Sequence, residues 1–494
     1  MHHHKALPGA ALASAAVLLM TACFPAAEEE AADGRISVAM MQPPRSGLTP
    51  LSDDAFKLSR WSTAETLVVL DEAGDPQPGL ATDWTQVDAT TWTFTVREGV
   101  TFHDGTELTA DTAAHALSFA AQAAPKPRIL DGVELEVDAE GDTLTVTTAD
   151  EDPLVPQRLS SPQLSILAES AYDGDAVDPV GTGSGPFEIV EVNGTTSARL
   201  DRFDDYWGEP AQAAGIDVSF VPDGTARAAA LRTGEADIVE SVPTSQAALL
   251  EEDTLTEVPM PRTNTLYLNT EQGPFTDHGT RAAVRDAIDA QALVDGVYEG
   301  RADVAEGLLG PAIPWAAERP ERTDPVEAAD PDGTPITLAT FTDRAELPEV
   351  ATVLEQQLED AGFEVEQVVR EYANIEEDAL AGEFDAFILS RATVLDSGDP
   401  AAYMTSDFSC DGSFNIAQLC DEDVDAALEE AGSAPTGEER RAAILAAEAA
   451  ILDTDAALPM LHERVLQGDA THVVGSAKDP RERLLITPQT HLDR

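Results

Sequence analysis

Alternating apolar and polar side chains predict a half-buried strand over residues 92–96 (WTFTV), because successive side chains of a strand point to opposite faces. Asp104-Gly105 then supplies turn residues that tolerate positive φ. A helix is expected directly afterwards, since Thr109 is a good N-cap residue and Asp111 lies where the helix dipole favours an acid. The buried side of this helix consists of Ala113, Ala114, Leu117 and Phe119.

Similar patterns predict strands along the rest of the chain. In the first half they cover residues 36–40, 134–137, 143–147 and 187–192. In the second half a helix over 348–360 alternates with strands over 336–341, 364–369 and 384–389, and a last strand covers 458–465. This β-α-β rhythm predicts an α/β protein with a mostly parallel sheet.

The chain is too long for one hydrophobic core. Its 494 residues exceed the length at which chains divide into domains, which is roughly 250–300 residues. Two domains are therefore expected from length alone.

The N-terminal segment is typical of an exported bacterial lipoprotein. Lys5 precedes an apolar run over residues 10–20 that is too short to span a membrane, and small residues precede Cys23. We expect residues 1–22 to be a signal peptide and Cys23 to carry a lipid after cleavage. Residues 23–35 contain consecutive glutamates without apolar periodicity, which predicts a tether. The alternative is an ordinary signal peptide with an incidental cysteine.

The composition is strongly acidic. The sequence has 92 Asp and Glu residues against 29 Lys and Arg, which gives a formal net charge of −63. Such a surface repels nucleic-acid backbones and anionic headgroups, so we expect no nucleic-acid partner and a membrane contact through the lipid alone. Lysine occurs only at positions 5, 57, 126 and 478, and arginine supplies the other cations.

The three cysteines fit an extracytoplasmic location. With Cys23 assigned to the lipid, Cys410 and Cys420 form a pair in an oxidising compartment, and a disulfide between them is expected. The alternative is a metal site, but two cysteines at this spacing without a nearby histidine make a poor set of zinc ligands.

No catalytic motif is recognisable in the sequence. The Gly-rich segment 181–185 lacks the Lys-Ser/Thr of a P-loop, and neither G-x-S-x-G nor H-E-x-x-H occurs. His103 is interpreted as a structural residue of its turn. We therefore expect a binding protein rather than an enzyme, with no cofactor and no metal held directly by side chains. A surface hydrolase would need a nucleophile and a base in one cleft, and an adhesion module would need a large apolar patch.

Three blocks of sequence follow the pattern of one family in order. Residues 78–111 contain P-x-LA-x-x-W, W-x-F-x-x-R-x-G-V-x-FHDG and LTA-D; residues 181–239 contain GTGSGPFEIV, a Tyr-Trp-Gly turn and RTGEADIV; residues 264–277 contain TLYLNTEQGPFTD. Together they resemble the family 5 extracytoplasmic solute-binding proteins of ABC importers, which include dipeptide-, oligopeptide- and nickel-binding proteins.

The resemblance implies a two-lobed periplasmic-binding-protein fold of type II, similar to cluster C, with an extra subdomain in lobe I and two hinge-crossing segments. By this analogy lobe I covers residues 36–264, with the inserted subdomain at about 76–180. Lobe II covers 265–466, and residues 467–494 return to lobe I.

The best candidate for ligand contact is the segment 391–415, because it should emerge at the carboxyl end of a strand, where ligands of open α/β sheets gather. It resembles the stretch of dipeptide-binding members in which an aspartate of a D-x-G-D-P turn holds the peptide ammonium. The match falls on Asp396, with Asp399 in the turn and Asn415 as a further candidate at the end of the segment. A carboxylate suits an ammonium in a cleft that excludes water. The alternative is that Asp396 only caps a turn.

One family feature is missing at its expected place. Dipeptide binders use an arginine near the start of the helix that is predicted here from Pro348, to receive the peptide carboxylate. This chain has Pro348-Glu349 at that point, and Arg344 lies upstream. The departure argues against a strict dipeptide specificity.

The alternative solute is nickel or another metal carried by a small organic chelator. The sequence GVYEGRADVAEGLLGPAIPW resembles the nickel-binding branch, and Arg391 lies where that branch places an arginine that meets an anionic chelate. Arg128 is a candidate for a second such contact. For Arg391 the alternative is a surface or inter-lobe salt bridge.

Three aromatic residues complete the candidates. Phe56, Trp61 and Tyr403 occupy segments that face the cleft in relatives, although an apolar aromatic is more often a core residue.

The resemblance implies a lipid-anchored receptor on the extracytoplasmic face of the cell membrane. It would capture a small peptide and deliver it to an ABC permease with its ATPase subunits. We expect the receptor to act as a monomer and to close on its solute by hinge bending.

Overall fold

The computed structural model describes residues 34–322, 325–394 and 397–493. The predicted signal peptide, the lipidated Cys23 and the candidate Asp396 lie outside these residues. Within the described ranges, we find no helix with the length and apolar character needed to cross a bilayer.

The helices fall mainly in the second half of the chain. In order they are α1 (Ala55–Arg60), α2 (Ala110–Gln122), α3 (Val155–Arg158), α4 (Gly224–Thr233), α5 (Thr244–Ala247), α6 (His278–Ala287), α7 (Ala290–Gly296), α8 (Glu346–Ala361), α9 (Glu376–Leu380), α10 (Ala401–Phe408), α11 (Glu422–Ser433) and α12 (Glu438–Asp453).

Most strands belong to one 11-stranded sheet. Its members are β1 (Arg35–Met40), β10 (Phe187–Asn193), β11 (Ser197–Arg202), β12 (Gly215–Phe220), β13 (Ile238–Val239), β14 (Leu255–Leu268), β15 (Ala302–Val304), β16 (Pro335–Phe341), β17 (Glu364–Arg370), β18 (Ala386–Ala392) and β19 (Ala457–Asp469). The order is β10-β11-β12-β1-β13-β19-β14-β18-β16-β17, and β15 pairs with β19.

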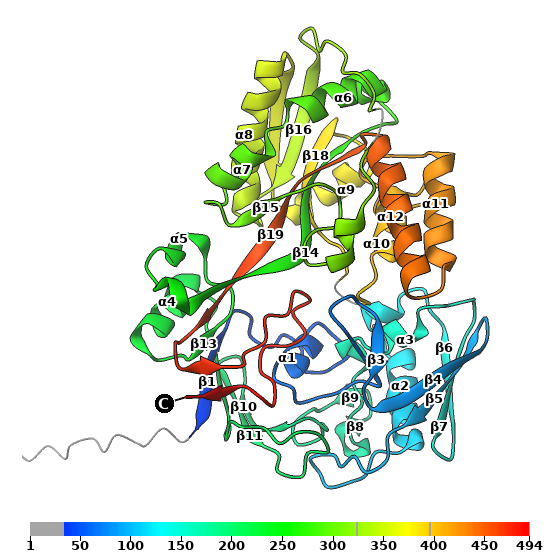
Figure 1. Ribbon diagram of the computed structural model, residues 1–494, viewed down its shortest axis with the longest axis vertical. Coiled ribbons are helices and arrows are strands. Elements are labelled where there is room, and N and C mark those ends of the chain that lie inside the picture. Colours follow the sequence, from blue (N-terminus) through cyan, green and yellow to red (C-terminus); the bar gives the residue numbers. More distant parts are fainter. Residues whose placement is uncertain (1–33, 323–324, 395–396, 494) are drawn as a thin grey trace, which may run out of the picture. The chain divides into compact units, whose positions relative to one another are not determined.

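The two ends of this sheet belong to two lobes (Figure 1). We call the part with β1 and β10 to β13 lobe I, and the part with β15 to β18 and α6 to α12 lobe II. In lobe I, β1 pairs in parallel with β12 and β13; in lobe II, β16 pairs in parallel with β17 and β18. The predicted two-lobed α/β fold is thus confirmed.

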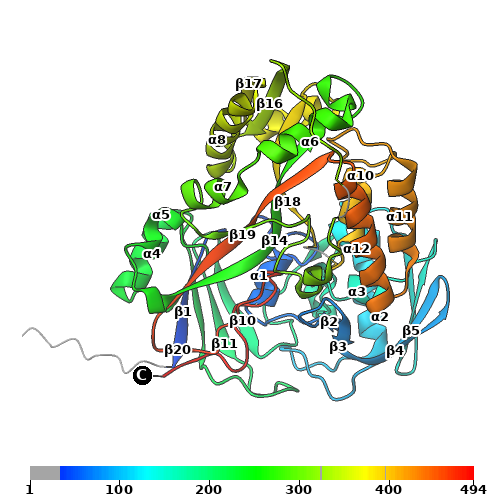
Figure 2. The same cartoon turned by 45° about the horizontal axis from the view of Figure 1, so that its top comes forward.

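Two long strands connect the lobes (Figure 2). β14 and β19 pair antiparallel along most of their lengths, with a register shift between Pro259 and Thr263. One end of β19 pairs with β13 of lobe I, while one end of β14 pairs with β18 of lobe II. Pro259 and Pro261 have no N–H for the ladder, which explains the irregular pairing at this point. These strands are the two hinge-crossing segments.

An additional subdomain precedes the long strands. Its antiparallel sheet has the order β4-β5-β7-β6, formed by β4 (Ala81–Asp88), β5 (Thr91–Val96), β6 (Leu135–Glu140) and β7 (Thr143–Thr148). Thr109 caps α2 as predicted, because its hydroxyl accepts from Thr112 N at 3.1 Å. The helix packs its apolar side on the sheet in a core that includes Trp92, Phe94, Leu117, Leu144 and Val146. Smaller paired strands are β2 (Val68–Leu70) with β3 (Pro76–Pro78), β8 (Tyr172–Asp173) with β9 (Ala176–Val177), and β20 (Val473–Val474) with β21 (His491–Leu492).

Two predicted boundaries differ in lobe II. α8 begins at Glu346 rather than at 348, so that Arg344 lies two residues before the helix. The strand predicted over 384–389 is β18, which covers 386–392. Its start is delayed because the Asp385 carboxylate accepts from Thr337 N at 2.8 Å. Arg391 consequently lies within the strand, opposite Thr263 of β14.

Candidate functional site

A cavity of about 740 Å³ lies where segments of both lobes meet. Its walls come from the turn after α1, the β2–β3 hairpin, residues 311–314 of lobe II and the C-terminal segment 477–488. Small-molecule sites typically have volumes of roughly 300–1,000 Å³. The cavity therefore has room for a small organic solute or a short peptide.

Much of the cavity wall is apolar. Val69 and Leu484 are both 45% exposed, which is unusual for large apolar side chains, and both line the cavity. Such side chains gain hydrophobic stabilisation when a ligand covers them. The remaining apolar lining includes Leu70, Leu80, Pro162, Pro186, Pro311, Pro314, Pro480 and Pro488.

A buried carboxylate lies beneath the cavity. Glu65 accepts hydrogen bonds from Ser184 Oγ at 2.7 Å, Tyr206 OH at 2.9 Å and Trp207 Nε1 at 2.9 Å. Burial raises the pKa of Glu65, and these three donors oppose the shift. The Tyr-Trp pair of the second sequence block is thus explained, because both side chains hold one buried acid. Its oxygens are engaged within the fold.

Two other acids of the lining, Asp71 and Asp479, also have local partners. Asp71 Oδ1 accepts from Ala73 N at 2.9 Å and from Asp75 N at 3.0 Å, in an Asx turn. Asp479 Oδ2 accepts from Arg483 N at 2.8 Å and from Leu484 N at 3.0 Å. These carboxylates shape turns of the cavity wall rather than neutralise its cations.

Three cations line the same cavity from one segment, at positions 478, 481 and 483. Lys478 contacts the carboxylate of Asp469, and burial lowers the pKa of this lysine to about 8. Arg481 donates through one terminal nitrogen to the backbone oxygen of Asp71, and its Nε is buried with no partner among the described residues. Arg483 Nη1 donates to Ser160 O at 3.1 Å. This segment therefore brings three cations to a cavity lining that also contains four acids, Glu65, Asp71, Glu72 and Asp479.

The turn 71–75 of the β2–β3 hairpin touches lobe II. Trp315 Nε1 donates to Ala73 O at 3.0 Å, and Arg441 of α12 forms an ion pair with Asp75. Gly74 has a φ of +85°, and a methyl group there would lie 3.0 Å from Gly398 O. We call this set of contacts the inter-lobe clasp. It brings lobe I against the segment that carries the D-x-G-D-P turn.

That segment is fixed at both flanks. Thr393 N donates to Pro261 O at 2.9 Å. Asp399 forms a buried, bidentate ion pair with Arg440, at 2.5 and 3.1 Å. Asp396 itself lies outside the described residues, between these two anchors. Its neighbour Gly398 contacts the clasp, so the flanks of the predicted ammonium site lie at the junction of the lobes.

Arg391 and Tyr403 belong to a polar cluster inside lobe II, and neither lines the cavity. Arg391 donates from Nε and Nη2 to the Asp407 carboxylate at 2.8 and 2.7 Å, and its guanidinium lies 4.3 Å from the ring centre of Phe414. Burial raises the pKa of Asp407 to about 6, against the effect of Arg391. Tyr403 is 7% exposed, with its hydroxyl beside Asp407 and Tyr267. The structure therefore places Tyr403 in the core.

The remaining predicted contacts lie away from the cavity lining. Arg128 lies 3.5 Å from Asp53 at the start of α1, the helix that carries the partly exposed Phe56. Asn415 donates to Ser409 O at 3.0 Å and Leu419 O at 2.7 Å, inside the loop that the Cys410–Cys420 disulfide closes. Trp61 is fully buried.

A group of charges occupies the hinge. Glu463 of β19 accepts from Arg344 at 2.8 Å, from Asn264 Nδ2 at 2.8 Å and from Ser390 Oγ at 2.5 Å. Arg262 of β14 lies 3.9 Å from the same carboxylate. Burial lowers the pKa of Arg262, and the nearby Arg344 adds to the shift. Glu463 thus holds Arg344 near the start of α8, at the carboxyl ends of the lobe II strands.

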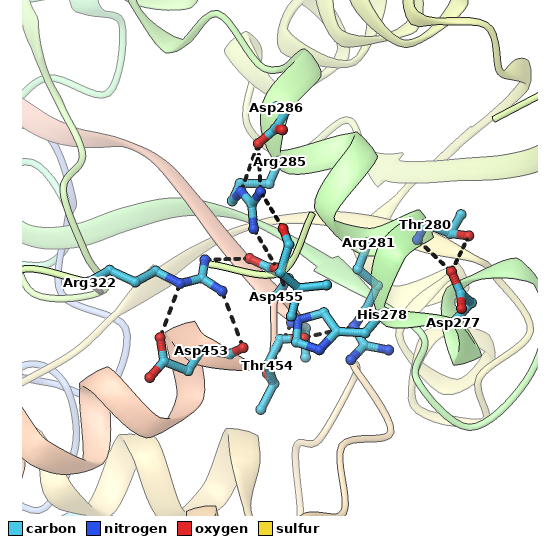
Figure 3. A network of polar contacts seen from close by, with 12 residues as sticks. Asp277, His278, Thr280, Arg281, Arg285, Asp286, Arg322, Asp453, Thr454 and Asp455 are labelled. Atoms are coloured by element: carbon cyan, nitrogen blue, oxygen red, sulfur yellow. Dashed lines mark hydrogen bonds and ion pairs between the residues drawn. The ribbon is translucent and has the colours of Figure 1, made fainter. Parts of the chain in front are cut away.

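Another group of charges lies between α6 and the end of α12 (Figure 3). The fully buried Asp455 accepts from Arg285 at 2.8 Å, from Arg322 at 2.6 Å and from His278 Nε2 at 3.1 Å. Arg322 also pairs with Asp453 at 3.0 Å. Arg285 and Arg322 thus face acids, whereas the neighbouring Arg281 donates to the backbone oxygens of Thr454 and Phe275. Among the described residues, including this network, no group of three or more His, Cys, Asp or Glu side chains is placed to hold a metal ion.

Two lobes that share a hinge of two long strands and meet at a cavity define a solute-binding protein. A model of the bacterial extracellular solute-binding proteins, family 5, matches residues 75–415. The chain belongs to this family, whose members serve ABC importers.

Known relatives bind different solutes. The nickel-binding protein NikA of Staphylococcus aureus (strain NCTC 8325 / PS 47) is 25% identical over 378 residues, which cover 73% of this chain and 75% of that protein. The glutathione-binding protein GsiB of Escherichia coli (strain K12) is 27% identical over 297 residues, or 56% of this chain and 58% of that protein. The solved structure of a nickel ABC transporter protein from Bacillus halodurans matches with a TM-score of 0.82 and 25% identity, covering 93% of this chain and 100% of that chain.

The sequence reasoning missed the C-terminal wall of the cavity. The run KDPRER over residues 478–483 places three of the 29 basic residues within six positions. In so acidic a chain this local excess of cations was a usable signal. It could not, however, indicate which distant segments these side chains would face.

Proposed function

We propose that the protein is a lipid-anchored receptor that captures a small peptide and delivers it to the permease of its ABC importer. The observation that carries the proposal is the cavity of about 740 Å³ beside the inter-lobe clasp. A solute there would touch both lobes, and a ligand shifts an open–closed equilibrium only through its higher affinity for the closed state. Closure would then signal to the permease that the receptor is loaded.

A peptide is favoured for two reasons. The flanks of Asp396 are anchored at the junction of the lobes, where a carboxylate could hold a peptide ammonium in a cleft shielded from water. GsiB, which shares 27% identity over part of the chain, is named for binding glutathione, a tripeptide. We further propose that Arg344, which lies two residues before α8, is the counterpart of the arginine that dipeptide binders place near the start of this helix.

The second candidate is nickel carried by an organic chelator. It is supported by the relationship to NikA of Staphylococcus aureus and by the fold shared with the Bacillus halodurans protein. In this case Arg128 and Arg391 are the proposed contacts of an anionic chelate. Because Arg391 is already paired with Asp407, Arg128 is the better of the two to test by substitution.

A thermal-shift screen of the purified protein separates these solutes. Peptide pools are compared with nickel or cobalt, each with and without histidine as the chelator. Saturation at about 100 times the Kd should stabilise the protein by about 2.7 kcal/mol. A peptide shift that Asp396→Ala removes, and that the exposed control Asp253→Ala keeps, supports peptide capture. A shift with the metal chelates alone, reduced in Arg128→Ala, supports the second candidate.

The lipid anchor at Cys23 and the binding of the solute without a chemical reaction are separate parts of the proposal. Cys23→Ser should move the protein from the membrane fraction to the soluble extracytoplasmic fraction, since a covalent lipid is the proposed attachment. The relatives described above are solute-binding proteins rather than enzymes. We propose that this chain, as a monomer, likewise binds and releases its solute unchanged, which mass spectrometry of the eluted ligand would test.

A further inference from the structure

We propose that Arg481, assisted by Lys478, receives a carboxylate group of the solute, so that the cavity selects solutes with a carboxylate next to an apolar portion. This inference rests on the proposed function, because it assigns a chemical class to the solute of the same cavity. The residues belong to the C-terminal wall, which is distinct from the start of α8 and from the D-x-G-D-P turn.

The first argument is the distribution of charge. Cations are scarce in this protein, with 29 bases against 92 acids. Even so, one short segment lines the cavity with Lys478, Arg481 and Arg483. Of the acids beside them, Asp469 contacts Lys478, whereas Asp71 and Asp479 accept hydrogen bonds from backbone N–H groups of their own turns. Glu72 lies in the same lining. Among these three cations, Arg481 reaches a backbone oxygen and forms no ion pair with an acid of the described residues.

The second argument is the state of the Arg481 side chain. Its one recorded hydrogen bond goes to a neutral acceptor, the backbone oxygen of Asp71, and no acid among the described residues forms an ion pair with it. Its Nε is buried without a partner. A buried donor without an acceptor is unfavourable, because it has lost its hydrogen bond to water and gained no other. A carboxylate offers the planar pair of acceptors that a guanidinium fork matches, so it would relieve this cost.

The third argument is the environment of the two cations. Lys478 reaches the cavity beside Asp469 and donates to Ser476 Oγ at 3.0 Å, which leaves it a secondary role. Leu484 follows Arg481 in the same segment, and Val69 lines the cavity from the β2–β3 hairpin; both are substantially exposed. Cationic and apolar surfaces thus share one wall. A solute with a carboxylate and an adjacent apolar group complements both.

Matched ligands test the inference by calorimetric titration of the purified protein. The tripeptides Leu-Ala-Glu and Leu-Ala-Gln are each prepared as the free acid and as the C-terminal amide, and nickel is offered with citrate or with histidine. We expect the probe that supplies the required carboxylate to bind at least about tenfold more tightly than its uncharged counterpart, as for a charge-assisted hydrogen bond. Weaker binding of the C-terminal amides identifies the C-terminal carboxylate as the recognised group. Weaker binding of Leu-Ala-Gln than of Leu-Ala-Glu identifies a side-chain carboxylate, and tighter binding of nickel citrate identifies the carboxylate of a chelate.

Variants assign this preference to the proposed residues. Arg481→Gln should abolish most of the preference, Lys478→Gln should reduce it less, and Arg481→Lys should restore part of it by returning a cation. Arg232→Gln, on the exposed side of α4, is the matched control and should bind as the unchanged protein. The Arg481 variants must keep the melting temperature of the free protein, which separates lost recognition from a displaced 71–75 turn.

The outcomes distinguish this inference from the function on which it rests. If the unchanged protein binds acids and their uncharged counterparts within twofold, or if Arg481→Gln keeps the preference, the carboxylate assignment is overturned while solute capture stands. If the unchanged protein binds none of the peptides and neither nickel complex, both proposals are overturned.

Discussion

The Asp455 network of lobe II and the C-terminal wall of the cavity use cations in opposite ways. Around Asp455, Arg285 and Arg322 each face a buried carboxylate, and the network lies away from the cavity lining (Figure 3). In the cavity wall, Arg481 faces a backbone oxygen and has a buried Nε without a partner. A protein with a net charge of −63 has acids to spare for every cation. A cation that lines a cavity and is held apart from these acids is therefore a better sign of ligand binding than one that is paired.

The hinge cluster resembles the Asp455 network more than it resembles the cavity wall. Glu463 collects hydrogen bonds from Arg344, Asn264 and Ser390, which come from three different parts of the fold. Such a cluster can fix the register of the crossing strands, because a displaced strand would leave a buried charge unpaired. The cluster therefore serves the hinge, and Arg344 would have to exchange Glu463 for a solute carboxylate to take the role proposed for it.

The largest expected effect is in the Asp455 network. Asp455→Asn should lower the free energy of unfolding by about 3–5 kcal/mol, because it removes the charge of a buried acid that two arginines face. Asparagine also tolerates the φ of +53° at this position, so backbone strain should not contribute. Urea unfolding measures the change. Asp453→Asn is the control, since this acid is 62% exposed and should contribute less than about 1 kcal/mol.

The pH dependence of stability tests His103, a buried group that lacks an acidic hydrogen-bond partner. His103 Nε2 lies 2.9 Å from Gly185 O, and burial lowers the pKa of His103 to about 4. The unfolded chain has a histidine pKa of about 6.5 and so binds the proton more readily. The contribution of neutral His103 to the free energy of unfolding is fully present above pH 6.5. It decreases as the pH falls toward 4, by up to about 3 kcal/mol. In His103→Gln the slope of unfolding free energy against pH should be shallower; an unchanged slope would contradict the assignment.

A smaller effect is expected at the inter-lobe clasp. Gly74→Ala should destabilise the protein by about 2 kcal/mol, because it combines positive φ with a close approach to Gly398 O. Gly141→Ala has the same kind of strain at a φ of +67° but meets no atom within 4 Å. Comparison of the two variants by urea unfolding and solute titration isolates the contact between the lobes. Only Gly74→Ala should weaken solute binding.

The smallest change in stability is expected in the cavity wall. Arg481→Gln breaks no ion pair among the described residues, so the free energy of unfolding should change by less than about 1 kcal/mol. A loss as large as that of Asp455→Asn would show that Arg481 holds the structure together. The contrast between the paired cations around Asp455 and Arg481 in the cavity wall would then fail, and with it the assignment of Arg481 to the solute.

Local elements were predictable because their signals are local. The cap at Thr109 and the strand over residues 36–40 follow from neighbouring residues in sequence, and the structure places β1 at Arg35–Met40. The start of α8 was predicted two residues late, because no strong N-cap residue marks it. Because of this error, the prediction placed Arg344 four residues before the helix, whereas the structure places it two residues before. The difference matters because the proposed function assigns Arg344 to the solute.

The sequence alone indicated an α/β protein through periodicity and the family through ordered motifs, and the resemblance to that family implied the two lobes and the strands that cross the hinge. Only the tertiary structure decided which charges are paired. Arg481 reaches the backbone oxygen of Asp71 although the two are separated by 410 positions. Arg391 and Tyr403, which motif analogy assigned to the ligand, pack around Asp407 within lobe II. Such partnerships arise from the packing of distant segments, and no local pattern of residues encodes them.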